Sequence, residues 1–129
     1  MSPVGIVLVS HSQKLAEGLA ELLAQIGSDE VVVVVAAGSP SGGLGTNPSE
    51  VEAAIAKATC PEGVVVIPDL GSSVLTVRSL LDQSSTNGTI LVDAPFVEGA
   101  VAAAVTAASG GSLQEVADAA RAARDVRKL

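Results

Sequence analysis

Aromatic side chains are nearly absent from this 129-residue chain, which has no tryptophan, no tyrosine and a single phenylalanine, Phe96. Cationic residues are also few: 7 lysines and arginines stand against 14 acidic residues, for a formal net charge of −7. Proteins that bind nucleic acids rely on cationic surface, and single strands are commonly held on aromatic platforms. We therefore expect no nucleic-acid partner.

Cysteine is scarce too, because Cys60 is the only one. A lone cysteine excludes a disulfide within the chain and is typical of a reducing compartment. Polar or charged residues interrupt each apolar run before it reaches the length of a membrane span, and the first residues lack the basic segment of a signal peptide. We expect a cytoplasmic protein that does not associate with membranes.

What the chain does have is an apolar core built from small and β-branched side chains. Hydrophobic residues make up 48% of the sequence and charged residues 16%, which is typical of a folded globular protein. A length of 129 residues suits one hydrophobic core, so we predict a single domain over residues 1–129.

Short apolar runs alternate with segments of helical pattern along the whole chain. The predicted strands, each buried on both faces, cover residues 4–9, 31–35, 64–67 and 89–92. The predicted helices cover residues 12–26, 48–58, 96–109 and 112–128, and a further helix follows the turn at 69–73 and ends near residue 83. This alternation predicts an α/β fold, an open three-layer parallel sheet with helices on both faces. Right-handed crossovers favour the strand order 2-1-3-4.

The only histidine, His11, lies where the first strand ends and the first helix begins, in Ser10-His11-Ser12. Ligands and chemistry gather at the carboxyl ends of parallel strands, and helix N-terminal amides can hold a phosphate there. We hypothesise that His11 is a nucleophile that carries a phosphoryl group. One histidine, one cysteine and scattered carboxylates have no metal-ligand spacing, so no metal site is predicted.

Asp69 follows the third strand, which the predicted order places beside the first. A carboxylate on one imidazole nitrogen fixes the tautomer, leaves the other nitrogen as nucleophile and stabilises positive charge on the ring. We therefore predict that Asp69 orients and stabilises His11. The alternative is that Asp69 only caps the helix that follows it.

Two glycine- and serine-rich segments reach the same edge of the sheet and are candidates for phosphate binding. The loop after the second strand contributes Gly43, Gly45 and Thr46, although it has no Walker A sequence. Helix starts contribute the other candidates, which are Ser12, Gly71, Ser72 and Ser73. The alternative interpretation of these segments is a flexible turn and ordinary helix starts.

Taken together, the segments 7–12 and 69–73 and the Gly-rich loop resemble the mannose-type enzyme IIA family of the phosphotransferase system. The similarity is strongest to the phosphotransferase subunits of dihydroxyacetone kinases that depend on phosphoenolpyruvate (PEP), and it covers about residues 4–128. It implies the enzyme IIA fold, with His11 as the phosphorylated residue and Asp69 as the carboxylate that orients it. The segment from Gly43 to Thr46 corresponds to the one that borders the phosphate.

The resemblance also implies a route for the phosphoryl group. The phosphocarrier HPr donates it to His11, and it then passes to ADP bound on the nucleotide-binding kinase subunit. That subunit phosphorylates dihydroxyacetone held by a third subunit. The chain itself binds no cofactor and forms a covalent phosphohistidine, while ADP and ATP stay on the partner subunit. Members of the family are homodimers, so we expect a homodimer.

Two other functions are compatible with the same residues. One is the enzyme IIA domain of a mannose-type sugar transporter, which uses the same fold and the same histidine. The other is a non-catalytic α/β module that binds an anion or nucleotide at the glycine loop. Ligand binding that survives the loss of His11 distinguishes the second from a transferase.

Overall fold

The computed structural model describes residues 3–27, 30–39, 43–83 and 88–129 of the chain. Its single described sheet has four parallel strands in the order 2-1-3-4, as the sequence predicts. The strands are β1 (Val4–Ser10), β2 (Val33–Ala37), β3 (Gly63–Pro68) and β4 (Thr89–Leu91). Because β1 and β3 are neighbours, the two segments that leave their carboxyl ends start side by side.

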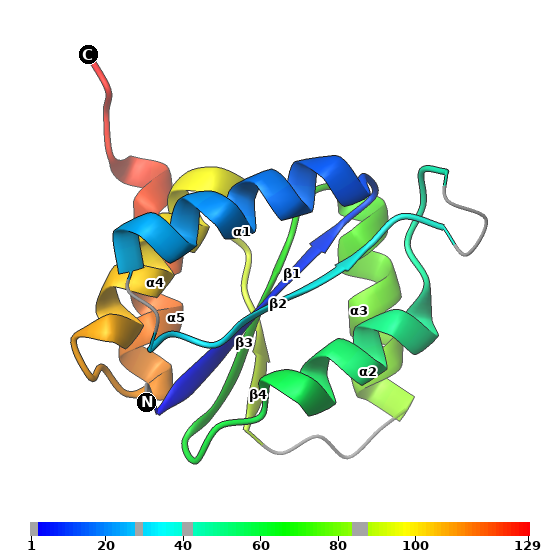
Figure 1. Ribbon diagram of the computed structural model, residues 1–129, viewed down its shortest axis with the longest axis horizontal. Helices are drawn as coiled ribbons and strands as arrows, with labels where there is room; N and C mark the ends of the chain where they lie inside the picture. Colours follow the sequence, from blue (N-terminus) through cyan, green and yellow to red (C-terminus); the bar gives the residue numbers. More distant parts are fainter. Residues whose placement is uncertain (1–2, 28–29, 40–42, 84–87) are drawn as a thin grey trace.

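Helices cover both faces of the sheet (Figure 1). They are α1 (Gln13–Gly27), α2 (Pro48–Ala58), α3 (Gly71–Gln83), α4 (Phe96–Ala108) and α5 (Leu113–Ala122), followed by the 3₁₀ turn η1 (Ala123–Asp125). Figure 1 shows α1, α4 and α5 on one side of the sheet and α2 and α3 on the other. The predicted three-layer α/β architecture is therefore confirmed.

The sheet separates two apolar cores, and β1 contributes to both because its side chains alternate between faces. Ile6 and Leu8 are buried against α1, α4 and α5, whereas Val7 and Val9 are buried against α2 and α3. All seven residues of β1 are buried. Because β1 is buried along its whole length, its carboxyl end, which His11 follows, is held in a fixed position.

Strand β2 begins and ends two residues later than the valine run predicts. The predicted range was 31–35, but pairing with β1 runs from Val33, opposite Ile6, to Ala37, opposite Ser10. The strong β preference of valine predicted a strand in this segment, but it could not predict which residues pair with β1. The sheet uses Ala36 and Ala37 because β1 continues that far.

Helix α5 is shorter than the predicted range of 112–128, which is wrong at its C-terminal end. The chain tightens into η1 after Ala122 and becomes extended at Val126. Arg124 bonds to the backbone carbonyl and carboxylate of Asp93. Lys128 pairs with Glu98 of α4 at 2.8 Å. The contacts of Arg124 and Lys128 with other elements coincide with the end of the helix. The local sequence pattern could not predict them.

The predicted helix starts are confirmed. The Asn47 side chain accepts a hydrogen bond from Ser49 N–H at 3.0 Å, with Pro48 in the first turn of α2. Ser112 and Glu115 form the predicted reciprocal capping box of α5. Ser12 caps α1 by accepting from Leu15 N–H at 3.2 Å. Within the described residues, the helices are too short or too polar to cross a bilayer.

Candidate active site

His11 and Asp69 lie side by side because each follows directly on one of two paired strands. His11 comes after the last residue of β1, and Asp69 comes after the last residue of β3. Asp69 N–H donates to the carbonyl of Val9 at 2.9 Å, which extends the pairing of the two strands by one step. His11 Nδ1 lies 3.0 Å from Asp69 Oδ1.

The Asp69 carboxylate is the most heavily bonded group of the site, and its side chain is only 7% exposed. Oδ2 accepts from the Ser10 hydroxyl at 2.9 Å and from His11 N–H at 3.0 Å. Oδ1 faces His11 Nδ1 and accepts from Leu70 N–H at 2.7 Å and from the Ser73 hydroxyl at 2.9 Å. These donors hold the carboxylate in one orientation.

The balance of burial and hydrogen bonding keeps Asp69 ionised. Burial by itself raises the pKa of this carboxyl. Hydrogen bonds from the His11 backbone and from the side chains of Ser73, Ser10 and His11 outweigh burial, so the pKa of Asp69 lies below its ordinary value. Asp69 is therefore a fixed negative charge beside the imidazole.

The geometry distinguishes the two nitrogens of the His11 ring. An ionised carboxylate can only accept a hydrogen bond, so Nδ1, which faces Asp69, carries the ring proton. In the neutral ring Nε2 then keeps its lone pair, and it contacts the hydroxyl of Ser72. The His11 side chain is 23% exposed, so the ring contacts Asp69 on its buried side and still reaches the surface.

Ser73 and Thr46 lie on the Asp69 side of the ring. Ser73 is fully buried, and its hydroxyl donates to Asp69 Oδ1 and lies 3.2 Å from His11 Nδ1. Its one proton is used on Asp69, so the 3.0 Å contact with the Thr46 hydroxyl has Thr46 as donor. The two hydroxyls thus link the Gly-rich loop to the carboxylate.

The Gly-rich loop is tied to the backbone at the histidine. Gly45 N–H donates to the carbonyl of His11 at 2.9 Å, and Gly45 has a φ of +146°, a conformation that favours glycine. Ser39 N–H donates to the carbonyl of Gly43 at 2.9 Å, which closes the loop on itself. Residues 40–42 of this loop lie outside the described residues.

Ser12 and Gly71, two further residues predicted to bind phosphate, lie at the starts of α1 and α3. The amide of Ser12 donates to the Ser10 hydroxyl at 3.1 Å, and the Ser12 hydroxyl caps α1. Gly71 is exposed at the first turn of α3, where an added Cβ has no heavy atom within 4 Å. Phosphate binding by these residues, and by the other candidates of the loop and of α3, stays a prediction.

Sequence reasoning missed one member of the site, Ser10. It is fully buried, donates to Asp69 and accepts from the amide of Ser12. The available signal was a polar residue that ends an otherwise apolar strand, since buried hydroxyls need partners.

The structure also bears on metal binding and on the reactivity of Cys60. The described residues contain no group of three or more histidine, cysteine or acidic side chains placed to hold a metal ion. Cys60 is 6% exposed, and burial raises the pKa of its thiol. A buried thiol with a raised pKa is a poor nucleophile, so Cys60 packs as a core residue.

Comparison with known families matches residues 5–117 to EIIA-man, described as "PTS system fructose IIA component". The chain is 42% identical over 105 residues to "PEP-dependent dihydroxyacetone kinase 2, phosphoryl donor subunit DhaM" of Listeria innocua, covering 79% of this chain and 84% of that protein. It is 39% identical over 119 residues to the "PEP-dependent dihydroxyacetone kinase, phosphoryl donor subunit DhaM" of Escherichia coli, covering 88% of this chain but 25% of that longer protein.

Solved structures share the fold. "Crystal structure of unknown function protein EF1359" is 33% identical, with a TM-score of 0.83 over 94% of each chain. "Crystal structure of sigma-54 interaction domain protein from Enterococcus faecalis" has a TM-score of 0.61 at 14% identity and covers 92% of this chain and 88% of its own. At that identity the second likeness supports the fold alone.

Proposed function

Because this chain belongs to the EIIA-man family of PTS fructose IIA components, we propose that it is the phosphoryl donor subunit of a PEP-dependent dihydroxyacetone kinase. It transfers phosphoryl groups through a phosphohistidine on His11. The observation that carries the proposal is the 3.0 Å contact between His11 Nδ1 and Asp69 Oδ1, which leaves Nε2 as the ring nitrogen that keeps a lone pair for attack.

The proposed reaction begins with attack by the His11 Nε2 lone pair on the phosphorus of the donor. The Nε2–P bond forms as the bond between phosphorus and the donor nitrogen breaks, and the electron pair of that bond stays with the donor. No proton needs to leave His11, because Nδ1–H stays on the ring. The ring gains positive charge, which the Asp69 carboxylate stabilises at 3.0 Å.

Ser72 takes part at the reacting face. In the unphosphorylated site its hydroxyl occupies the Nε2 lone pair, so it must turn away as the phosphoryl group arrives. A hydroxyl in that place can then donate to a phosphoryl oxygen. Amides at the start of α3 can supply further donors without adding positive charge. In the segment 43–46, the amides of Gly43 and Gly45 already donate to the Ser39 hydroxyl and to the His11 carbonyl, so they would have to give up those bonds to bind a phosphoryl oxygen.

The donor and the acceptor follow from the same proposal. In this proposal, phosphorylated HPr donates to His11, and the group then passes to ADP held by the nucleotide-binding kinase subunit. In the second transfer the Nε2–P bond breaks and a bond forms between phosphorus and a β-phosphate oxygen of ADP. The freed Nε2 recovers its lone pair, so the site returns to its starting state.

The test is phosphorylation by PEP, enzyme I and HPr. We expect one phosphoryl group per chain, labile to acid and stable to base, as for phosphohistidine. The His11→Ala variant takes up none. Label retained by that variant overturns the proposal, as does nucleotide binding that is equal in both proteins with no phosphorylation of either, the outcome for a non-catalytic module.

A second candidate is the enzyme IIA role in sugar transport, which the description of the matched family favours. The chemistry at His11 is the same, and only the acceptor differs. Phosphorylated protein is therefore mixed separately with the ADP-loaded kinase subunit and with an enzyme IIB of a mannose-type transporter. Discharge by the kinase subunit alone supports the first candidate, and discharge by enzyme IIB alone supports the second.

A further inference from the structure

Ser73 has a buried hydroxyl that contacts both His11 and Asp69. The residue is fully buried at the start of α3. Its hydroxyl donates its one proton to Asp69 Oδ1 at 2.9 Å and lies 3.2 Å from His11 Nδ1, which carries the ring proton. The ring proton therefore lies between two acceptors, Asp69 Oδ1 and Ser73 Oγ. A hydroxyl oxygen has two lone pairs, so Ser73 can accept from one more donor.

Thr46 supplies that further donor from the Gly-rich loop. Its hydroxyl lies 3.0 Å from the Ser73 hydroxyl, and it is the donor because the proton of Ser73 is already used on Asp69. The one proton and both lone pairs of Ser73 are then all bonded, as a buried hydroxyl requires. The hydrogen bonds run in one direction, from Thr46 to Ser73 to Asp69, and donors in such a chain strengthen one another.

The position of Thr46 is fixed by the residues on either side of it. Gly45, which precedes it, donates its N–H to the carbonyl of His11 at 2.9 Å. Asn47, which follows it, caps the start of α2. Two consecutive residues of the loop therefore hold the histidine backbone and, through the buried hydroxyl, the carboxylate beside the ring.

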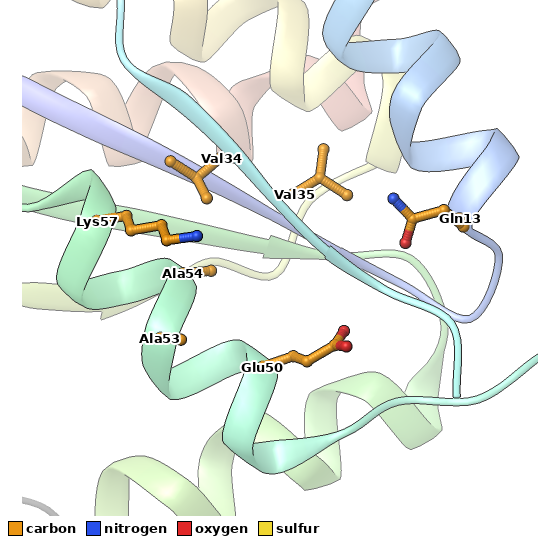
Figure 2. Close-up of a pocket in the computed structure, with 7 residues that line it drawn as sticks. All are labelled: Gln13, Val34, Val35, Glu50, Ala53, Ala54 and Lys57. Atoms are coloured by element: carbon orange, nitrogen blue, oxygen red, sulfur yellow. The ribbon is translucent and has the colours of Figure 1, made fainter. Parts of the chain in front are cut away.

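Charged side chains other than Asp69 do not contact the ring within the described residues. Glu50, in the first turn of α2, lines a cleft of about 300 Å³ between β2 and α2 instead (Figure 2). Lys14 of α1 and Arg78 of α3 are exposed, and neither forms an ion pair with Asp69. The orientation of the carboxylate therefore depends on hydrogen bonds and not on a second charge.

We propose that Thr46 is a positioning residue for phosphoryl transfer, and that it acts through Ser73 on the Asp69 carboxylate; this inference rests on the proposed function. The hydroxyl of Thr46 bonds on the Nδ1 side of the ring, whereas the reacting Nε2 contacts Ser72. As the Nε2–P bond forms and the bond between phosphorus and the donor breaks, the ring gains positive charge. The Nδ1 proton stays on the ring between two acceptors that are already oriented. Thr46 thereby contributes without touching the phosphoryl group.

The first test removes the hydroxyl of Thr46. For Thr46→Val we expect kcat for phosphorylation by HPr to fall by about tenfold, equivalent to about 1.4 kcal/mol, because the buried Ser73 hydroxyl loses a bonding partner. The KM for HPr should stay unchanged, since the hydroxyl lies on the Nδ1 side of the ring, and Thr46→Ser should restore most of the rate. Thr59→Val is the matched control, because the Thr59 hydroxyl donates to the carbonyl of Ile55 at the end of α2.

The second test follows the Nδ1 proton itself. His11 is the only histidine, so its ring N–H gives a single signal of its kind in nuclear magnetic resonance. In the unphosphorylated protein we expect this proton to exchange with water about tenfold faster in Thr46→Val than in the wild type, because less restrained acceptors release it more often. Thr59→Val should exchange at the wild-type rate. This measurement needs no phosphorylation, so it is separate from the test of the proposed function.

The third test asks whether Thr46 acts only through Ser73. Residues that act in series give non-additive losses, so adding Thr46→Val to Ser73→Ala should change kcat and proton exchange by less than about twofold. A further loss of about tenfold in kcat means that Thr46 contacts the phosphoryl group directly, and it overturns the proposal. Unchanged proton exchange in Thr46→Val also overturns it, as does a raised KM with unchanged kcat. A wild type that takes up no phosphoryl group overturns the proposed function, and the exchange rates then still decide whether Thr46 holds the ring proton in place.

Discussion

Asp69 fixes the position of His11 by hydrogen bonds to its backbone and to its ring. The aspartate accepts from His11 twice, once from the backbone amide and once from the ring, so the chain direction and the ring orientation are fixed together. Ser10 and Ser73 hold the carboxylate from two further directions. Because the charge is already oriented before the reaction, little reorganisation is needed when the ring becomes positive.

Replacing Asp69 with asparagine should slow phosphorylation far more than it disturbs folding. The amide keeps the shape but loses the charge that fixes the Nδ1 proton and stabilises the positive ring, so we expect the rate to fall by about 100-fold, the lower end of the loss when one preorganised electrostatic contact is removed. The rate is measured with HPr at saturating PEP. Asp93→Asn is the matched control, since Asp93 follows the neighbouring strand β4 but its side chain is 95% exposed. Equal rates in the two variants would mean that Asp69 only caps α3.

The lowered pKa of Asp69 predicts how acid affects stability. A carboxyl whose pKa is lower in the folded than in the unfolded state stabilises the fold fully above the unfolded value, about 3.9. This stabilisation is lost as the pH falls through the folded value. The difference in unfolding free energy between wild type and Asp69→Asn should therefore shrink as the pH falls below about 4. Urea titrations between pH 6 and pH 2 measure it, and a difference that grows with acidification contradicts the assignment.

At the scale of elements, the close approach of β1 to α2 requires a glycine. A Cβ built on Gly5 lies 1.9 Å from the carbonyl oxygen of Ala58, at the C-terminal end of α2. Ala58 itself is fully buried, and the oxygen is part of the backbone. The contact therefore cannot be relieved by turning a side chain, and the strand or the helix has to move.

Gly5→Ala should consequently destabilise the protein by about 1–3 kcal/mol or more, the range for overpacked cores. Gly18→Ala is the contrasting variant, because Gly18 lies within α1 with no heavy atom within 4 Å of an added Cβ. Alanine there should stabilise the helix by roughly 0.5–1 kcal/mol. Both values come from chemical denaturation. Opposite signs are the essential result, and a neutral Gly5→Ala would show that α2 packs more loosely on β1.

Element boundaries show where local pattern stops being informative. The caps at Asn47 and Ser112 could be predicted because their signals lie within four residues. The end of α5 could not, because Arg124 bonds to Asp93, 31 residues earlier in the chain. The shift of β2 has the same origin, since β1 decides which residues of the valine run are paired.

At the scale of the whole molecule, one sheet contributes side chains to both apolar cores. Leu8 packs toward α1, α4 and α5, and Val66 packs toward α2 and α3, and both are fully buried. Because the same strands contribute to both cores, neither face can unfold and leave the other intact. This supports the proposal that residues 1–129 form a single domain.

Leu8→Ala and Val66→Ala should therefore both lower the midpoint of one common unfolding transition. For Leu8→Ala we expect a loss of about 2–5 kcal/mol, and a smaller loss for the shorter side chain of Val66. Circular dichroism and calorimetry should report coincident transitions in each variant. Two separate transitions in either variant would show that the faces unfold independently.

The sequence alone determined the order of strands and helices, the α/β class and the identity of His11 and Asp69 as neighbours. Those features depend on hydrophobic periodicity, on capping residues and on the rule that parallel strands end at one edge. Only the tertiary structure decided which imidazole nitrogen faces the carboxylate, that Ser10 and Ser73 hold that carboxylate, and that Thr46 contacts Ser73. Each of these is a relation between residues distant in the chain, and it exists only once pairing and packing bring them within hydrogen-bond distance.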